Sequence, residues 1–163
     1  MIKKEYLFPF LLFIPAALLQ FTFAPLISFN HIAPDFILIL LVFYTIQMDQ
    51  FKGALYGFAF GFMIDVISGG IFGSAMFSKT LSGFIAGYFA NENKIDLYLH
   101  SFFFLVIVFL CATIDSISFA FLSGEDVSLS LAVLIFEQGL LPGLYTALVS
   151  VPVTLLYPKK GIV

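Results

Sequence analysis

The sequence contains no arginine, one cysteine and few charged residues, which make up 10% of its 163 positions. Without arginine, the chain lacks the side chain that best orients a peptide or phosphate group through paired hydrogen bonds. Cys111 cannot form a disulfide within the chain, and packing is the simplest role for a thiol in the middle of an apolar stretch. Such a low charge content also argues against an ordinary soluble domain.

Hydrophobic residues are what the sequence has instead, at 61% of the chain, with a mean hydropathy of +1.10. A membrane-spanning helix needs roughly 17–25 residues, so six of them would use nearly the whole chain. We therefore expect an all-α integral membrane protein with a single polytopic domain over residues 1–163. The expected spans are approximately 6–27, 34–48, 51–68, 72–89, 97–121 and 129–157. Pro142 and Pro152 predict a kink or a break in the last of them.

The basic residues fall in alternate gaps between these stretches, and the other gaps hold none. Lysines near the membrane are retained on the cytoplasmic side, so both termini and the turns at Lys52 and Lys94 are predicted to be cytoplasmic. An even number of spans follows, most simply six. The lysines that carry this pattern are Lys3, Lys4, Lys52, Lys94, Lys159 and Lys160.

The third stretch carries a glycine every four residues, at Gly53, Gly57 and Gly61, and the next position of that row is Asp65. Rows of small residues allow helices in lipid to approach closely. The fourth stretch offers a matching surface that includes Gly83 and Gly87. Two interpretations remain open: the two helices pack on each other, or the row docks a helix of another protein.

Beyond the first two positions of each expected span, four charged residues lie inside: Asp65, Lys79, Asp115 and Glu137. An ionised group near the bilayer centre costs at least ~2.5–3.5 kcal/mol unless it is paired or hydrated. Counting residues along the spans places all four in the outer half of the membrane, where we expect a polar cluster. Lys79 is predicted to pair with an acid, Asp65 being the first candidate. Three acids against one base imply a protonated carboxyl, or access for water or a partner; a purely structural network is the alternative.

Catalysis has little support in the sequence. Asp65 and Asp115 invite comparison with intramembrane aspartyl proteases, but the residues before Asp65 do not form a glycine-x-glycine-aspartate motif. His31 and His100 are expected at opposite membrane faces, which excludes a histidine-based metal site. We find no nucleophile, phosphate-binding or metal-ligand motif, and therefore expect no enzyme, no cofactor and no nucleic-acid partner.

The residues resemble those of a known family, the rod shape-determining protein MreD. The resemblance runs over about residues 30–157 and rests on loose spacings of glycine, proline and aspartate. It is carried by Pro34-Asp35 opening a short apolar span, Gly53, Gly57-Phe58, Gly61, Met63-Ile64-Asp65, Ser68-Gly69-Gly70, Gly73, Leu141-Pro142, Leu144-Tyr145-Thr146 and Pro152. Lysine stands here in cytoplasmic turns where the family often has arginine, which weakens any argument for bidentate contacts in those turns.

The resemblance implies a non-enzymatic scaffold of the bacterial cell-elongation machinery in the inner membrane. Its implied partners are the bitopic protein MreC, the transpeptidase and glycosyltransferase components of peptidoglycan synthesis, MreB filaments and the lipid bilayer. The family's fold is thought to resemble the substrate-binding component of energy-coupling-factor vitamin transporters. That likeness supplies the alternative function, a small-molecule binding subunit for uptake.

Overall fold

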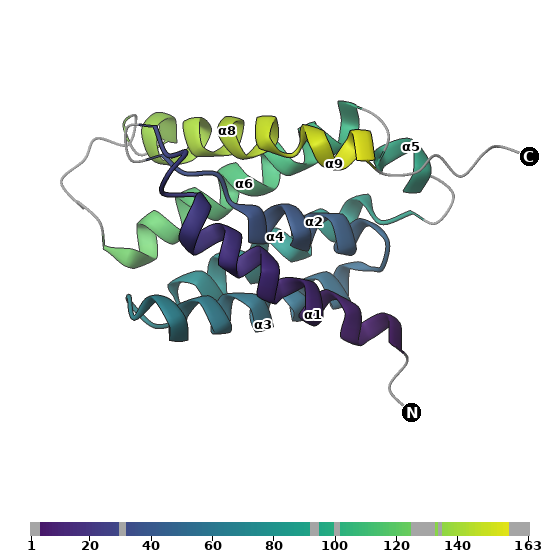
Figure 1. Ribbon diagram of the computed structural model, residues 1–163, viewed down its shortest axis with the longest axis horizontal. Coiled ribbons are helices and arrows are strands. Elements are labelled where there is room, and N and C mark those ends of the chain that lie inside the picture. The colour runs from purple at the N-terminus through teal and green to yellow at the C-terminus, as the bar shows by residue number, and fades with distance from the viewer. Residues whose placement is uncertain are drawn as a thin grey trace, which may run out of the picture.

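The computed structural model describes residues 4–29, 32–91, 95–99, 102–124, 133 and 135–156. Within these residues the regular structure is helical (Figure 1), which agrees with the expected all-α class. The elements are α1 (Lys4–Leu18), η1 (Leu19–Phe23), α2 (Phe36–Ile46), α3 (Gln50–Ser68), α4 (Ser74–Ala86), η2 (Gly87–Phe89), α5 (Ile95–Leu99), α6 (Phe102–Ser123), η3 (Phe136–Leu140), α8 (Leu141–Val149) and α9 (Val151–Leu156).

The long helices run side by side along the molecule, and α1 begins at the same end at which α9 finishes, on the right in Figure 1. The centre of the bundle is α2, which contacts α1, α3, α4 and α6. Its side chains Leu38, Leu41 and Val42 have no solvent exposure. The apolar core therefore forms around α2, as its uniformly hydrophobic sequence predicts.

The central helix α2 is short, because its 11 residues rise only about 16 Å while the hydrocarbon core is about 30 Å thick. It begins at Asp35, whose Oδ1 accepts a hydrogen bond from the Leu38 N–H at 2.8 Å. Pro34 disfavours the helical conformation for Ala33, the residue before it, so the helix does not extend further back. Contacts of Asp35 with Lys79 of α4 and with Thr146 of α8 hold the start of α2, and with it a carboxylate, inside the bundle.

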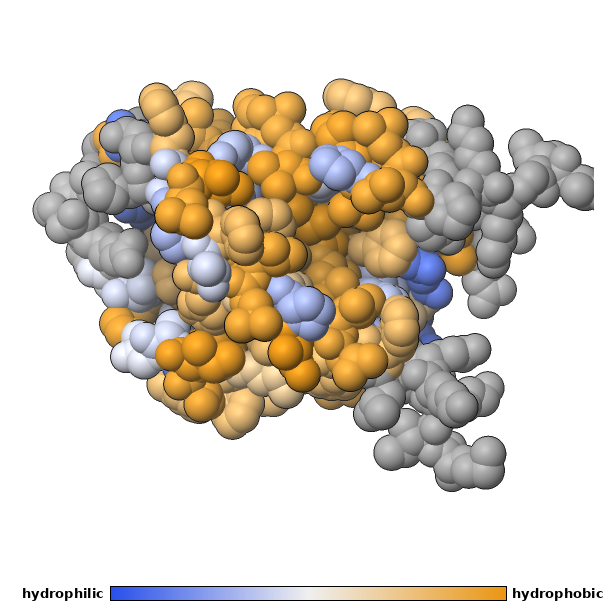
Figure 2. Space-filling model, in the orientation of Figure 1, coloured by the Kyte–Doolittle hydropathy of each residue, from blue (hydrophilic) through white to orange (hydrophobic). Residues whose placement is uncertain are grey.

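Three helical segments, Gln50–Ser68, Phe102–Ser123 and Phe136–Leu156, are long and apolar enough to cross a membrane, and Phe8–Phe23 and Phe36–Ile46 are shorter apolar helices. Large hydrophobic side chains are exposed on the outside of the bundle, among them Phe51, Leu11 and Phe121. The face in Figure 2 is correspondingly dominated by hydrophobic residues. The protein is built for a membrane, and the count of six spans stays a prediction.

The glycine face of α3 is covered by α4. A Cβ atom at Gly57 would overlap the backbone of Lys79 and Thr80 on α4, so only glycine permits this approach. The other glycines singled out in the sequence make equally close contacts: Gly53 with Gly83, Gly61 with Ala75 and Met76, and Gly87 with Gln50. This face is therefore used for close packing within the chain.

Two of the described helices contain a turn of π-helix just before a proline. In η1 the Ala24 N–H bonds to the Leu19 carbonyl, five residues back, and Pro25 follows. In η3 the Leu141 N–H bonds to Phe136 in the same way, and Pro142 follows. Proline lacks the N–H for the carbonyl four residues earlier, which favours such widened turns. The last helix is thus interrupted at η3 and again at Ser150, two residues before Pro152.

Turn chemistry also fixes the connection between α2 and α3. The Asp49 side chain accepts the Lys52 N–H at 2.8 Å and pairs with the Lys52 ammonium at 2.6 Å. This side-chain contact holds the pKa of the Asp49 carboxyl below its usual value. Asp49 therefore caps α3 in its charged form.

Candidate functional site

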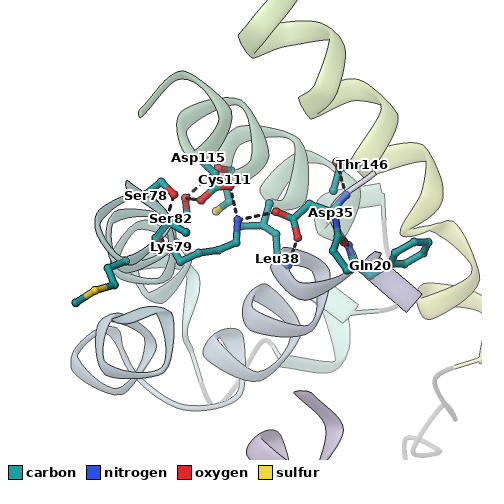
Figure 3. Close-up of polar contacts among 12 residues, drawn as sticks. Gln20, Asp35, Leu38, Ser78, Lys79, Ser82, Cys111, Asp115 and Thr146 are labelled. Atoms are coloured by element: carbon teal, nitrogen blue, oxygen red, sulfur yellow. Dashed lines mark hydrogen bonds and ion pairs between the residues drawn. The ribbon is translucent and has the colours of Figure 1, made fainter. Parts of the chain in front are cut away.

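Lys79 is the centre of the polar interior. It lies on α4, is 5% exposed, and its Nζ donates to Asp115 Oδ2 at 2.5 Å and to Asp35 Oδ2 at 2.6 Å (Figure 3). Asp115 belongs to α6 and Asp35 caps α2. One ammonium group thus joins three helices, and we call Lys79, Asp35 and Asp115 the charged triad.

The start of α2 is held from two further directions. The Asp35 N–H donates to Thr146 Oγ1 on α8 at 3.2 Å. Gln20, in the π turn η1, accepts the Phe36 N–H at 2.8 Å and donates to the Pro34 carbonyl at 3.2 Å. These contacts satisfy backbone groups that a helix beginning in an apolar interior would otherwise leave without partners.

Asp115 has a second partner on α4. Ser82 Oγ lies 3.4 Å from Asp115 Oδ1 and 3.2 Å from the Cys111 carbonyl, and the Ser82 side chain is fully buried. Both oxygens of Asp115 therefore face hydrogen-bond donors from α4. This satisfies a carboxylate that is itself only 5% exposed.

The expected pair between Lys79 and Asp65 is wrong. Asp65 instead accepts three backbone N–H groups at the start of α4: Gly73 at 2.9 Å, Ala75 at 3.1 Å and Met76 at 3.1 Å. Free N–H groups at a helix N-terminus stabilise a carboxylate, so Asp65 is satisfied at 3% exposure without a lysine. Because Asp65 and Asp115 have separate partners, they do not form the carboxylate pair of an aspartyl protease.

A cavity of about 620 Å³ lies beside the charged triad. Glu137 of η3, whose side chain is exposed, and the next residue, Gln138, both line this cavity. The Gln138 Oε1 atom is buried and has no hydrogen-bond partner among the described residues. The lining residues are Gln20, Phe21, Ile32, Ala33, Asp35, Ile37, Ile64, Ala75, Lys79, Asp115, Ser116, Phe119, Ala120, Glu137, Gln138, Leu141, Pro142 and Thr146.

The structure thus gathers three of the four predicted cluster residues, Lys79, Asp115 and Glu137, around one cavity, and gives Asp65 a separate role. Asp35 was singled out only through the family resemblance, and its place in the triad was missed. The signal for it was a Pro-Asp pair directly before an apolar run, which is typical of a helix start. Its partner lies 44 residues away, too far for local patterns to reveal.

The charges define what this site can do. Among the described lining residues there are three carboxylates and one ammonium, so the cavity wall carries an excess of negative charge. The described residues contain no cluster of three or more ligating His, Cys, Asp or Glu side chains that could hold a metal ion. The ion pairs of the triad hold helices together, and the surplus carboxylates can accept hydrogen bonds from a ligand. The same carboxylates disfavour the binding of anions.

Comparison with protein families matches residues 2–160 to the family described as rod shape-determining protein MreD. No curated protein and no solved structure matches the chain, so the expected likeness to energy-coupling-factor components stays a prediction. The match extends over nearly the whole chain, including every helix of the bundle and the cavity.

Proposed function

The chain belongs to the MreD family of rod shape-determining proteins, and we propose that it acts as a non-enzymatic scaffold that binds MreC in the bacterial inner membrane. Through MreC it supports peptidoglycan synthesis by the transpeptidase and glycosyltransferase components and its link to MreB filaments. The family match over residues 2–160 carries this proposal, because membership implies a role in rod shape determination. The chain crosses the membrane several times.

Two features of the bundle support a scaffold. Its interior is fixed by the charged triad and by the close α3–α4 contact, which leave little freedom for the helices to slide. Its exterior exposes many large apolar side chains, which suit lipid and the apolar span of a bitopic partner. Neither feature supplies a nucleophile or an activated water, as an enzyme would require.

Copurification from native membranes tests the proposal. A tagged chain should retain a single-span partner with a periplasmic domain, identified as MreC, and should restore rod shape in cells depleted of their own MreD. A tagged, equally abundant and unrelated six-span protein is the control. Normal accumulation of the tagged chain in the membrane, with neither MreC retained nor shape restored, would rule out the scaffold.

The cavity favours a second candidate function, the binding subunit of a small-molecule transporter. A volume of about 620 Å³ is within the range of ligand pockets in proteins. The same copurification discriminates: a retained vitamin together with an ATPase module indicates transport, whereas MreC alone indicates the scaffold.

A further inference from the structure

The residues that line the cavity beside the charged triad carry more carboxylates than ammonium groups. Lys79 lies between Asp35 and Asp115, so one of the two carboxylates is left over, and Glu137 adds another. Glu137 forms no ion pair within the part of the chain that the structure describes. Uncompensated negative charge in a membrane protein's interior is costly, and a cation in the cavity would remove that cost.

Hydrogen-bond acceptors are left over as well. The buried Gln138 Oε1 atom has no donor among the described residues, and the neighbouring Glu137 side chain is exposed. Both residues line the same cavity. A primary ammonium carries three donors and no acceptor, which is the complement of such a set.

The rest of the cavity wall is apolar. Ile37, Ile64 and Leu141 line it, together with the rings of Phe21 and Phe119, which can also face a cation. A bare metal ion would leave most of about 620 Å³ unfilled and finds no ligand cluster among the described residues. An anion would meet the surplus carboxylates.

From these observations we propose that the cavity binds a primary ammonium group carried on an apolar body. Glu137 and Gln138 hold the ammonium, and the aliphatic and aromatic wall holds the body. This chemistry has two sources, the head group of an amine-bearing lipid such as phosphatidylethanolamine, or a free alkylamine. The proposal does not depend on the scaffold function, because the purified chain suffices to test it.

Thermal unfolding of the purified chain in dodecyl maltoside provides the test. Cys111 is fully buried and is the chain's one cysteine, so a thiol-reactive dye reports its exposure on unfolding. Octylamine should raise the midpoint temperature in a saturable manner, whereas octanol and octanoate, of similar size, should not. Equal stabilisation by octanol, or greater stabilisation by octanoate, would overturn the proposal.

A pair of variants locates the binding. Glu137→Gln removes one charge from an exposed side chain and should weaken octylamine binding about tenfold, as expected for loss of a charge-assisted hydrogen bond. The control Asp49→Asn removes a carboxylate at the other end of α3 and should leave the affinity unchanged. Unchanged affinity in Glu137→Gln, with the control also unchanged, would overturn the assignment.

Competition identifies the source. If phosphatidylethanolamine weakens octylamine binding and phosphatidylglycerol does not, the natural ligand is an amine-bearing lipid; if neither competes while octylamine binds, it is a free amine. Failure of octylamine to bind refutes the ammonium site and leaves MreC copurification as a separate question.

Discussion

At the residue scale, the interior charges are satisfied in two different ways. Lys79 is shared by two carboxylates from other helices, whereas Asp65 is bound by backbone N–H groups of the helix that follows it. A buried ion pair adds little net stability because both partners lose hydration. Removal of one partner is costly, however, because the remaining charge is then left in an apolar surrounding.

The charged triad predicts non-additive effects of mutation. Lys79→Met should destabilise the fold by ~3–5 kcal/mol, since it leaves Asp35 and Asp115 facing each other without a cation. The double variant Lys79→Met/Asp115→Asn should be less damaged than Lys79→Met alone. Unfolding in denaturant, or rod-shape complementation, measures the difference.

A second double-mutant cycle, with Asp65→Asn in place of Asp115→Asn, provides the control. Because Asp65 and Lys79 share no partner, the effects of Asp65→Asn and Lys79→Met should simply add. Additivity in the Lys79/Asp115 cycle, or strong coupling in the Lys79/Asp65 cycle, would contradict the observed pairing.

Asp65 itself should behave as a helix cap. Asp65→Ala removes the acceptor of three N–H groups and should cost about 1–3 kcal/mol, the usual penalty for buried donors left without a partner. Asp65→Asn keeps one oxygen, which can still accept the Gly73 and Met76 N–H groups, but it turns an amide donor toward the Ala75 N–H, so it should recover only part of the loss. Equal losses in the two variants, read from thermal midpoints, would argue against the capping role.

The sequence predicted the members of the site better than their pairing. The cost of charge in lipid was enough to single out Lys79, Asp115 and Glu137, which line one cavity. The depth estimate assumed that every span starts at the membrane surface, and α2 does not: Asp35 starts it inside the bundle. The sequence paired Asp65 with Lys79 because the true partners of Asp65 could not be recognised. These partners are backbone N–H groups of the loop and first turn before and within α4, and their positions depend on the tertiary structure.

At the element scale, contact between α3 and α4 depends on glycine. Their backbones approach so closely that the carbonyls of Lys79 and Ala75 occupy the places where Cβ atoms of Gly57 and Gly61 would be. Close approach brings many weak contacts that lipid cannot replace. It also positions Lys79 toward α2 and α6, so helix packing and the polar site are linked.

Substitution at Gly57 should therefore destabilise the fold. Gly57→Ala places a methyl group against the backbone of Lys79 and Thr80, which cannot move aside as a flexible side chain could. Gly70→Ala is the control, because its nearest neighbour would be Ser68 Oγ at 3.8 Å. We expect Gly57→Ala to aggregate or be degraded and Gly70→Ala to match the wild type in detergent. A stable Gly57→Ala that loses only its partner would show that the face is an interface instead.

Element positions were largely predictable from hydropathy, and their ends were not. The stretch expected over 72–89 starts as a helix at Ser74, because Gly73 adopts a φ of 102° and Asp65 caps the helix from outside. Pro142 and Pro152 did signal interruptions of the last span. That Pro142 produces a π turn, with Gln138 facing a cavity, depends on tertiary packing that the proline alone does not specify.

At the scale of the whole molecule, the cavity collects residues from the same end of successive helices. It receives Gln20 and Phe21 from the end of α1–η1 and Ile64 and Phe119 from late in α3 and α6. It receives Asp35, Ala75 and Glu137 from the starts of α2, α4 and the last helix. Successive helices therefore run in opposite directions. This arrangement is the one expected from lysines that lie in every second gap between the apolar stretches.

We expect this polar end to face the outside of the cell, with both termini and the lysine turns in the cytoplasm. Site-directed labelling in intact cells tests it most directly: with Cys111 replaced by alanine, single cysteines are introduced at Gly70, at the cavity end of α3, and at Lys94, and treated with a membrane-impermeant maleimide. We expect labelling of Gly70→Cys from outside and of Lys94→Cys only after the membrane is permeabilised. Labelling of Lys94→Cys in intact cells, with Gly70→Cys protected, would contradict it.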